Sequence, residues 1–206
     1  MWALVEDNTI TKIINNPKAM LIGGPQYSRN IFSFRWSNAE REAIGLYEIV
    51  FDNSKKKEEE YYINTNQTFT YDADAGTVTA TYGKATARAH ADANATDADG
   101  NDLDPVIVIE GLKTKKIRNV KIQASSILTQ TDWYIVRKAD AGTAVPSAIT
   151  NHRAAVRTKC AEMETAITNA ADTPAIETLY TSVNTADEGD PVVMERPLGE
   201  LPTLES

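Results

Sequence analysis

A seven-residue repeat between residues 147 and 170 constrains the fold of this chain more than any other feature. Pro146 and Ser147 are suited to begin a helix, because proline is favoured at the first helical position. Two sets of side chains then recur every seven residues: Ile149, Val156, Met163 and Ala170, and four residues after the first three of these, Arg153, Cys160 and Ile167. This spacing predicts one long helix that packs lengthwise against a second helix.

The second helix is predicted over residues 112–129, where apolar side chains follow helical spacing: Ile117, Val120, Ala124, Ile127 and Leu128. Between the two helices, Thr131 and Asp132 are expected to cap a further element that ends at Gly142. Trp133 and Tyr134 begin this element, and we expect them to plug the end where the long helices meet.

Residues 1–83 are predicted to form a β-rich domain of short antiparallel strands. The segments WALVED and TITKIIN flank the turn residues Asp7 and Asn8, which favours an opening hairpin. A second hairpin is expected within residues 61–82, with its turn at residues 72–76. The predicted fold class is therefore α+β, with a helical hairpin following the strands.

A short helix is predicted between these hairpins. Ser37 with Glu40 three residues later is a capping box, and Gly45 is suited to end the helix before a strand over residues 46–51. At the far end of the chain, Pro174 is expected to open a last short helix that runs to Tyr180.

Composition divides the remainder. Residues 84–104 contain little except Ala, Thr, Asp, Asn and Gly, which indicates an acidic linker or mobile loop before a helical domain over residues 105–182. Asp104 and Pro105 could cap a helix, although the following VIVIEG is β-branched enough to be a strand, and both alternatives stay open. Residues 183–206 are predicted to form an extended, acidic, proline-rich tail.

The net charge of −8 is unevenly distributed. Residues 92–104 and 183–206 together hold 11 of the 29 acidic residues and 1 of the 21 basic ones, which leaves 18 acids and 20 bases elsewhere. Five of these bases lie in the sequence LKTKKIRNVK, residues 112–121, without the aromatic residues that nucleic-acid binding favours. We expect no nucleic-acid partner; these bases suit a solvated helix face or an acidic neighbour, such as the tail of another copy.

Little in the sequence points to secretion, to a membrane or to catalysis. The first residues are not a basic-then-apolar leader, no apolar run is long enough to cross a bilayer, and Cys160 is the single cysteine. Phosphate-loop, dinucleotide and zinc-protease motifs are missing, and neither His90 nor His152 has a cue that brings it beside a nucleophile. Cys160 occupies a buried position of the repeat. We therefore expect no enzyme, no catalytic residue and no cofactor.

The best candidate for a metal loop is DADGND, residues 97–102. Asp97, Asp99 and Asn101 match the first, third and fifth positions of a calcium loop, but Asp102 replaces its glycine and Val108 its bidentate carboxylate. A solvated acidic loop fits this pattern better, and no metal site is predicted.

The tail sequence GDPVVMERPLGELPTLES places apolar side chains between prolines that prevent a helix. These side chains are predicted to bind a neighbouring chain by strand addition or by docking in a groove. The predicted contacts are Val192, Val193, Met194, Leu198, Leu201 and Leu204.

Two segments resemble motifs of bacteriophage tail proteins. Trp36-Ser37, Glu40-Arg41 and Gly45-Leu46-Tyr47 are similar to a W-S-x-x-E-R-x-x-x-G-[IL]-Y segment found near the start of many of these proteins. Thr131-Asp132-Trp133 with Pro146, Arg153 and Arg157 resembles the signature T-D-W … P-x-x-[IV]-x-x-[YF]-R-x-x-[VL]-R of tail fibre assembly and tail assembly chaperone-like proteins; His152 stands where the family usually has an aromatic residue. From Trp36 to Arg157 the resemblance extends over 122 residues.

The resemblance implies a tail-associated protein that acts through protein–protein contacts. We expect a structural component of the virion tail, made in the host cytoplasm: an adaptor, baseplate or fibre-attachment subunit that binds other tail proteins and copies of itself as a homo-oligomer. Trp133, Tyr134, Arg153 and Arg157 are expected to take part in these contacts by orienting the helical pair. The alternative is a non-virion tail fibre assembly chaperone, which would present an exposed apolar groove and a free tail.

Overall fold

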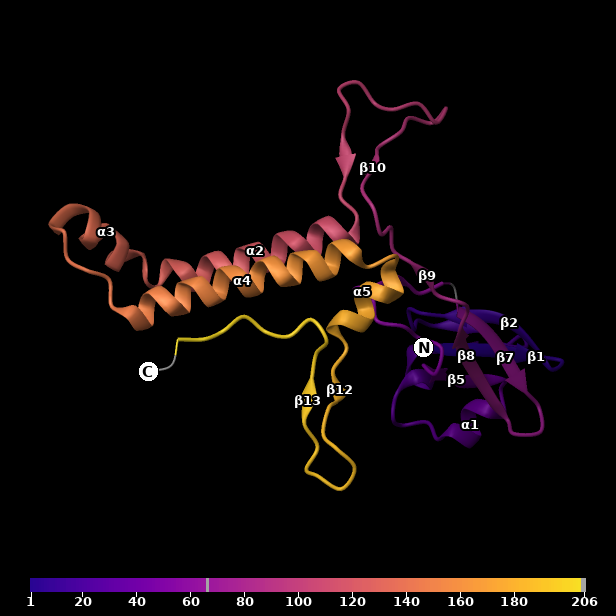
Figure 1. Cartoon of the computed structure of the whole chain (residues 1–206). Helices are drawn as coiled ribbons and strands as arrows, with labels where there is room; N and C mark the ends of the chain where they lie inside the picture. The colour runs from indigo at the N-terminus through magenta and orange to yellow at the C-terminus, as the bar shows by residue number, and fades with distance from the viewer. Residues whose placement is uncertain (66, 205–206) are drawn as a thin grey trace. The chain divides into compact units, whose positions relative to one another are not determined.

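The computed structural model describes residues 1–65 and 67–204, which fall into two compact units, residues 1–86 and 87–206. The first unit is built mainly of strands and the second mainly of helices (Figure 1). The prediction of a mixed α+β fold is therefore confirmed. We describe each unit by itself.

Five strands form the sheet of the first unit in the order β2-β1-β5-β8-β7. Their bounds are β1 Trp2–Glu6, β2 Thr9–Ile14, β5 Leu46–Asp52, β7 Gln67–Asp72 and β8 Thr77–Tyr82. Neighbours are antiparallel except β5 and β8, which are parallel. Asp7 and Asn8 connect β1 to β2 with φ of 49° and 60°, the left-handed conformation at both central residues that a tight hairpin turn requires. The predicted opening hairpin is confirmed.

The sheet buries apolar side chains on both faces, because side chains alternate along each strand. Trp2 and Leu4 of β1 point into one cluster with Ile14, Ile31 and Leu46. The opposite face carries a second cluster, built from Ala3, Val5, Ile49, Val78 and Ala80.

Short elements cover the first cluster: β3 (Met20–Leu21), β4 (Gln26–Tyr27), the 3₁₀ helix η1 (Arg29–Phe32) and α1 (Asn38–Glu42). The predicted capping box is confirmed, since the Ser37 hydroxyl accepts from the Glu40 amide at 3.3 Å and the Glu40 carboxylate accepts from the Ser37 amide at 2.7 Å. Gly45 ends the turn after α1 with φ of 76°, and β5 follows as predicted.

The second predicted hairpin begins later than expected. The turn after Asp72 is present, with Asp72 Oδ1 accepting from the Asp74 and Ala75 amides, and it joins β7 to β8. Tyr62 and Ile63, which were expected to belong to the same strand as β7, form the separate strand β6. Tyr61 and Tyr62 are both buried, and Asn66 lies outside the described residues.

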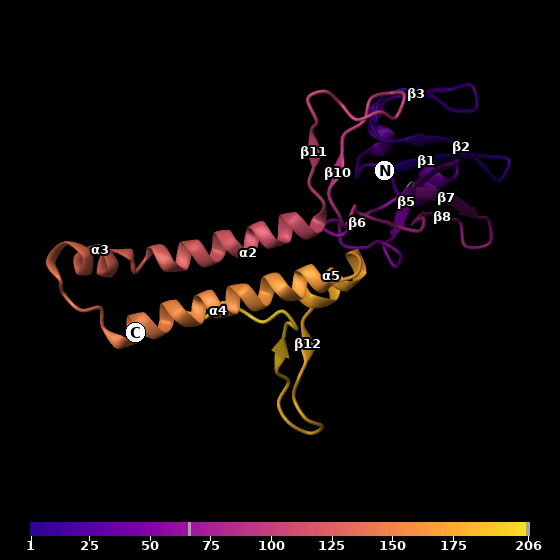
Figure 2. The same ribbon diagram turned by 45° about the horizontal axis from the view of Figure 1, so that its top comes forward.

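The second unit is organised by two long helices, α2 (Leu112–Thr129) and α4 (Ser147–Asn169), which lie side by side (Figure 2). They are antiparallel, because the Lys113 side chain at the start of α2 donates to the Thr168 carbonyl near the end of α4 at 3.0 Å. The repeat positions of α4 are buried as predicted: Ile149, Arg153, Val156, Cys160, Met163 and Ile167. Two shorter helices, α3 (Asp132–Ala141) and α5 (Thr173–Tyr180), begin and end close to the predicted residues.

Two hairpins project from the helical pair of this unit (Figure 1). We call them the first arm, residues 93–109 with β10 (Ala93–Asn94) and β11 (Val108–Ile109), and the second arm, residues 183–195 with β12 (Val183–Asn184) and β13 (Met194–Glu195). The strand alternative for VIVIEG is therefore correct, because its β-branched residues pair with residues 93–94 of the predicted linker. The remaining strand, β9 (Thr86–Ala87), lies at the boundary between the units in the sequence.

Candidate functional site

Arg153 holds together the turn between α2 and α3. Its side chain is on α4 and the residue is only 7% exposed. One guanidinium nitrogen, Nη1, donates to the Leu128 carbonyl at 2.6 Å and to Thr131 Oγ1 at 2.7 Å, while Nη2 lies 2.8 Å from Asp132 Oδ1. A buried cation at the carbonyl end of a helix is favourable because that end carries partial negative charge. Arg153 therefore orients the helical pair and leaves little of its side chain for a partner.

Thr131 differs from its predicted role as a side-chain cap. Its hydroxyl donates to the Leu128 carbonyl at 3.0 Å and accepts from Arg153. The Thr131 side chain makes no capping bond to the first turn of α3. Asp132 is the first residue of α3, and its carboxylate supplies a negative charge at the positive end of the helix dipole instead.

The expectation that Trp133 and Tyr134 plug the end of the helical pair is wrong. Trp133 is 51% exposed, and its ring lies on that of Tyr134 with 3.8 Å between centroids. The junction is already filled by Thr131 and Arg153, both of them buried, so Trp133 lies on the outside of α3 and Tyr134 is half-buried. Ile135 and Val136 are exposed beside the aromatic pair, so the first half of α3 presents apolar side chains to solvent.

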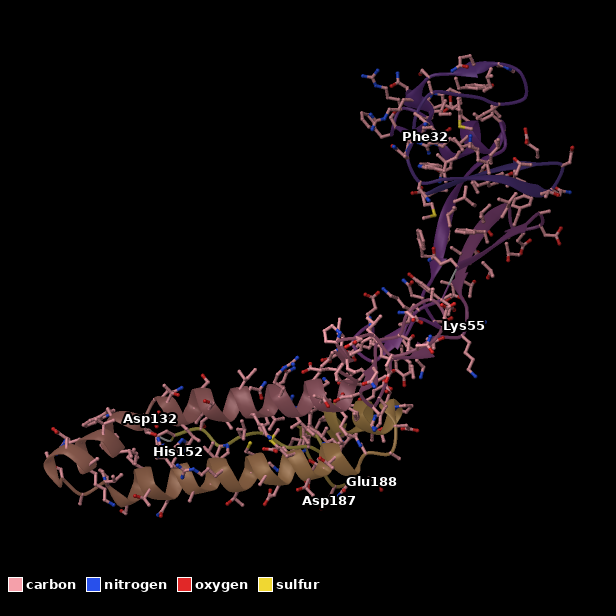
Figure 3. The ribbon with its side chains drawn as sticks, turned by 90° about the horizontal axis from the view of Figure 1, so that it is seen from above. Phe32, Lys55, Asp132, His152, Asp187 and Glu188 are labelled. Carbon is pink, nitrogen blue, oxygen red and sulfur yellow. The ribbon has the colours of Figure 1, made fainter. Side chains whose placement is uncertain are left out.

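A groove of about 480 Å³ runs along α2 and α4 next to this junction. Asp132 and His152 mark the same end of the helical pair in Figure 3. Arg157 lines the groove and is exposed, as a partner contact would require. The other lining residues are Lys121, Ala124, Ser125, Leu128, Thr129, Asp132, Arg153, Cys160, Ala161 and Glu164.

Cys160 is buried, as its position in the repeat predicts. Burial raises the pKa of its thiol, and the hydrogen bond that Sγ donates to Glu164 at 3.4 Å acts in the same direction. Glu164 is paired across the helices with Lys121 at 3.0 Å. The thiol is thus held protonated and is unsuited to nucleophilic attack.

The arms expose the largest run of apolar side chains. Val106, Ile107, Val108 and Ile109 of the first arm are each 53–58% exposed, so the side chains on both faces of the strand meet solvent. The second arm exposes Val192, Val193 and Met194 by 70%, 47% and 58%. The second set was predicted to bind a partner; the first was missed. Its signal in the sequence is the recurrence of an acidic run followed by Pro-Val and β-branched residues.

The C-terminal tail beyond the second arm packs on its own chain, most deeply at Leu198. Leu198 is 3% exposed, and its amide donates to the Leu179 carbonyl of α5 at 2.9 Å. The expectation that Leu198 contacts a partner is therefore corrected, because α5 and the adjoining chain already bury it. Leu201 is half-buried, and Leu204 remains exposed.

The other polar candidates have local roles. Asp97 closes the tip of the first arm by accepting from the amides of Asp99 and Asn101 at 2.9 Å, and these hydrogen bonds lower its pKa. His152 is half-buried on α4, and His90 lies in the segment before the first arm. Among the described residues, His, Cys, Asp and Glu side chains do not gather into a group that could hold a metal ion.

The segment with the W-S-x-x-E-R motif is part of the core of the first unit. Arg41 is buried, donates to the Ile31 and Ser33 carbonyls, and stacks 4.8 Å from the centre of the Trp2 ring. Gly45 lies so close to β1 that a β-carbon would be 2.3 Å from the Val5 carbonyl oxygen. These motif residues are needed for packing.

None of the helices within the described residues is long and apolar enough to span a membrane. Comparison with protein family models, curated proteins and solved structures finds no match to this chain.

Proposed function

We propose that this protein is a structural component of a bacteriophage virion tail, an adaptor, baseplate or fibre-attachment subunit that works through contacts with other tail proteins and with copies of itself. The observation that carries the proposal is the pair of arms with apolar strands exposed on both faces. Exposed contiguous apolar surface is characteristic of protein interaction sites. An adaptor needs such surfaces at more than one place.

The contacts within the second motif support this assignment. Thr131 and Asp132 bind Arg153 directly, although 20 residues separate Asp132 from Arg153 in the sequence. The number of residues between the T-D-W segment and Arg153 thus allows α4 to run back along α2 and to place Arg153 at the turn after α2. The residues that resemble the signature therefore contact one another within the helical hairpin, in addition to matching it at separate positions of the sequence.

Binding in this proposal consists of main-chain pairing and burial of apolar side chains. Complete burial of a Val, Ile or Met side chain contributes roughly 1.5–3 kcal/mol. Because the arm side chains are about half exposed, each would gain roughly half of that on docking. Several such side chains per arm are enough to give a stable contact within a multivalent particle.

A non-virion tail fibre assembly chaperone is the second candidate. The groove along α2 and α4 is the surface it would use, although charged and polar side chains supply most of the groove's lining. The two functions differ in the final location of the protein: a structural subunit stays in the particle, and a chaperone does not. Mass spectrometry of purified particles decides between them, with the host lysate measured in parallel. Several copies per particle support the structural role; absence from particles, with the chain bound to a fibre protein in the lysate, supports the chaperone. Absence from both contradicts each proposal.

A further inference from the structure

The two arms follow one pattern. The first reads NATDADGNDLDPVIVIE over residues 94–110, and the second reads NTADEGDPVVME over residues 184–195. Each begins with an Asn, turns through acidic residues at a glycine with positive φ, and returns as Pro-Val followed by apolar residues and Glu. Equivalent backbone bonds close them: Ala95 N to Ile107 O at 2.7 Å, and Thr185 N to Val193 O at 2.8 Å.

Each arm is a two-stranded ribbon with a free edge. In the first arm β11 pairs with β10 on one side, and the whole Val106–Ile109 run is exposed. An exposed apolar edge of this kind, although β11 itself is short, is a template for pairing with another strand. The acidic tip, with Asp97, Asp99, Asp102 and Asp104, limits which strand orientation is possible, because like charges brought side by side repel.

The two arms differ in charge at the point where each joins the rest of the chain. The first arm leads directly into α2, which holds five basic residues and not one acidic residue. Lys116 is buried, and Arg118 and Lys121 are paired with Glu110 and Glu164, so the charges offered at the start of α2 are those of Lys113 and Lys115. The second arm leads into the tail, where Arg196 is paired with Glu200 at 2.7 Å. The first arm therefore has acidic residues at its tip and basic residues where it joins α2, whereas the second arm has only the acidic tip.

We propose that two copies of this chain pair through their first arms, with β11 of each copy antiparallel to β11 of the other about a two-fold axis. A pairing centred on Val108, whose backbone faces the free edge because Ile107 is bonded to Ala95 on the other side, places Asp104 of one copy opposite Leu112 of the other. Asp102 then lies beside the start of the other copy's α2, near Lys113 and Lys115. A parallel pairing would instead align the two acidic tips.

This contact is isologous, so each copy uses the same surface and the pair is closed. It deepens the proposed function by naming how copies associate, and its test uses the purified chain without any particle. Failure of the pairing is thus distinguishable from failure of the tail assignment. The second arm, which lacks the basic base, stays free for a different chain.

Sedimentation velocity of the full chain over about 1–100 µM tests the pairing. We expect a monomer–dimer equilibrium that weakens about tenfold or more between 50 and 500 mM NaCl, since the tip-to-base attraction is screened. Val108→Lys should abolish the dimer at all of these concentrations, and Val193→Lys, the matched change on the second arm, should leave it intact. Both side chains are exposed, so neither change should unfold the chain, and far-UV circular dichroism checks this.

A charge exchange tests the antiparallel orientation. Asp102→Lys and Lys115→Asp should each weaken the dimer. The double variant should restore it, because the new lysine at position 102 of each copy then faces the new aspartate at position 115 of the other across the axis. A monomer throughout the concentration range overturns the proposal. So does a dimer that survives Val108→Lys, that Val193→Lys disrupts instead, or that the double charge exchange fails to restore.

Discussion

Asp92 caps α2 from nineteen residues before Gly111: its Oδ1 accepts from the Gly111 amide at 2.7 Å, while Oδ2 accepts from the Thr114 hydroxyl at 3.0 Å. Gly111 has no side chain with which to cap the helix, so a carboxylate from the start of the first arm takes that role. The same bonds fasten the base of the first arm to α2.

This capping predicts a pH dependence. The hydrogen bond from Gly111, followed by that from Thr114, lowers the pKa of Asp92 from its ordinary value of 3.8. A lowered folded-state pKa contributes stability that is present above pH 3.8 and is lost as the pH falls through the lowered pKa. Asp92→Asn should lower Tm at pH 7, and the difference from wild type should shrink below pH 3.8. Thermal melts by circular dichroism measure both, with Asp99→Asn at the arm tip as control. An equal Tm at pH 7 would contradict the capping role.

Breaking the Arg153 junction should be more costly. Arg153→Ala leaves the Asp132 carboxylate without its guanidinium partner and removes one of the donors to the Leu128 carbonyl. Removing one partner of a fully buried pair costs about 3–5 kcal/mol; because the Asp132 side chain is half exposed, we expect about 2 kcal/mol. Urea unfolding gives this value. Arg157→Ala, on the exposed side of the same helix, should stay within about 0.5 kcal/mol of wild type. Equal effects of the two substitutions would mean that the junction is not stabilising.

The Asp92 and Arg153 sites show which structural features local sequence patterns can predict and which they cannot. The repeat from Ile149 to Ile167 and the apolar spacing over residues 112–129 predict both long helices, because a helix face is set by neighbours three, four and seven residues apart. Asp92 and Gly111 could not be paired in this way, since no periodicity connects a loop carboxylate to a helix nineteen residues later.

The errors have the same origin. From the sequence, we expect Trp133 to plug the end where the two long helices meet. Its exposure follows from Arg153 filling the junction, a contact that only the return of α4 creates. Leu198 was assigned to a partner because the prolines around it prevent a helix, yet an extended segment can still place one side chain against α5. Which surface an isolated apolar side chain meets is a tertiary property.

Gly45 should tolerate substitution poorly for two separable reasons. Its φ of 76° disfavours any residue with a β-carbon, and that carbon would lie 2.3 Å from the Val5 carbonyl oxygen. Gly142 has a similar φ of 67° with open space around it. Gly142→Ala should therefore cost about 1 kcal/mol from backbone strain alone, and Gly45→Ala at least 2 kcal/mol, by urea unfolding. Similar losses for the two variants would show that the clash with β1 is relieved by movement.

Tyr47 and Tyr71 share a hydrogen bond between their hydroxyls at 3.0 Å on the second cluster of the sheet. This bond, with burial, raises the pKa of Tyr47 to about 12. The associated stability is present below pH 10, the ordinary value, and is lost as the pH rises toward 12. The ultraviolet titration difference between wild type and Tyr47→Phe should show a phenol near pH 12, and Tyr71→Phe should shift it down. A Tyr47 that titrates near pH 10 would exclude the bond.

Leu198 should decide whether the tail is fastened to the helices. Its side chain is buried and its amide donates to Leu179, so this amide should exchange slowly with solvent deuterium. Leu198→Ala removes about 2 kcal/mol of packing, which corresponds to roughly thirtyfold faster exchange over residues 196–202. Leu204→Ala, at an exposed position of the same tail, should leave the exchange unchanged. Unaltered exchange in Leu198→Ala would mean that other contacts hold the tail. Deletion of residues 183–206 should leave both units folded, because Leu198 is the only fully buried side chain among residues 183–204, and it should abolish incorporation into particles.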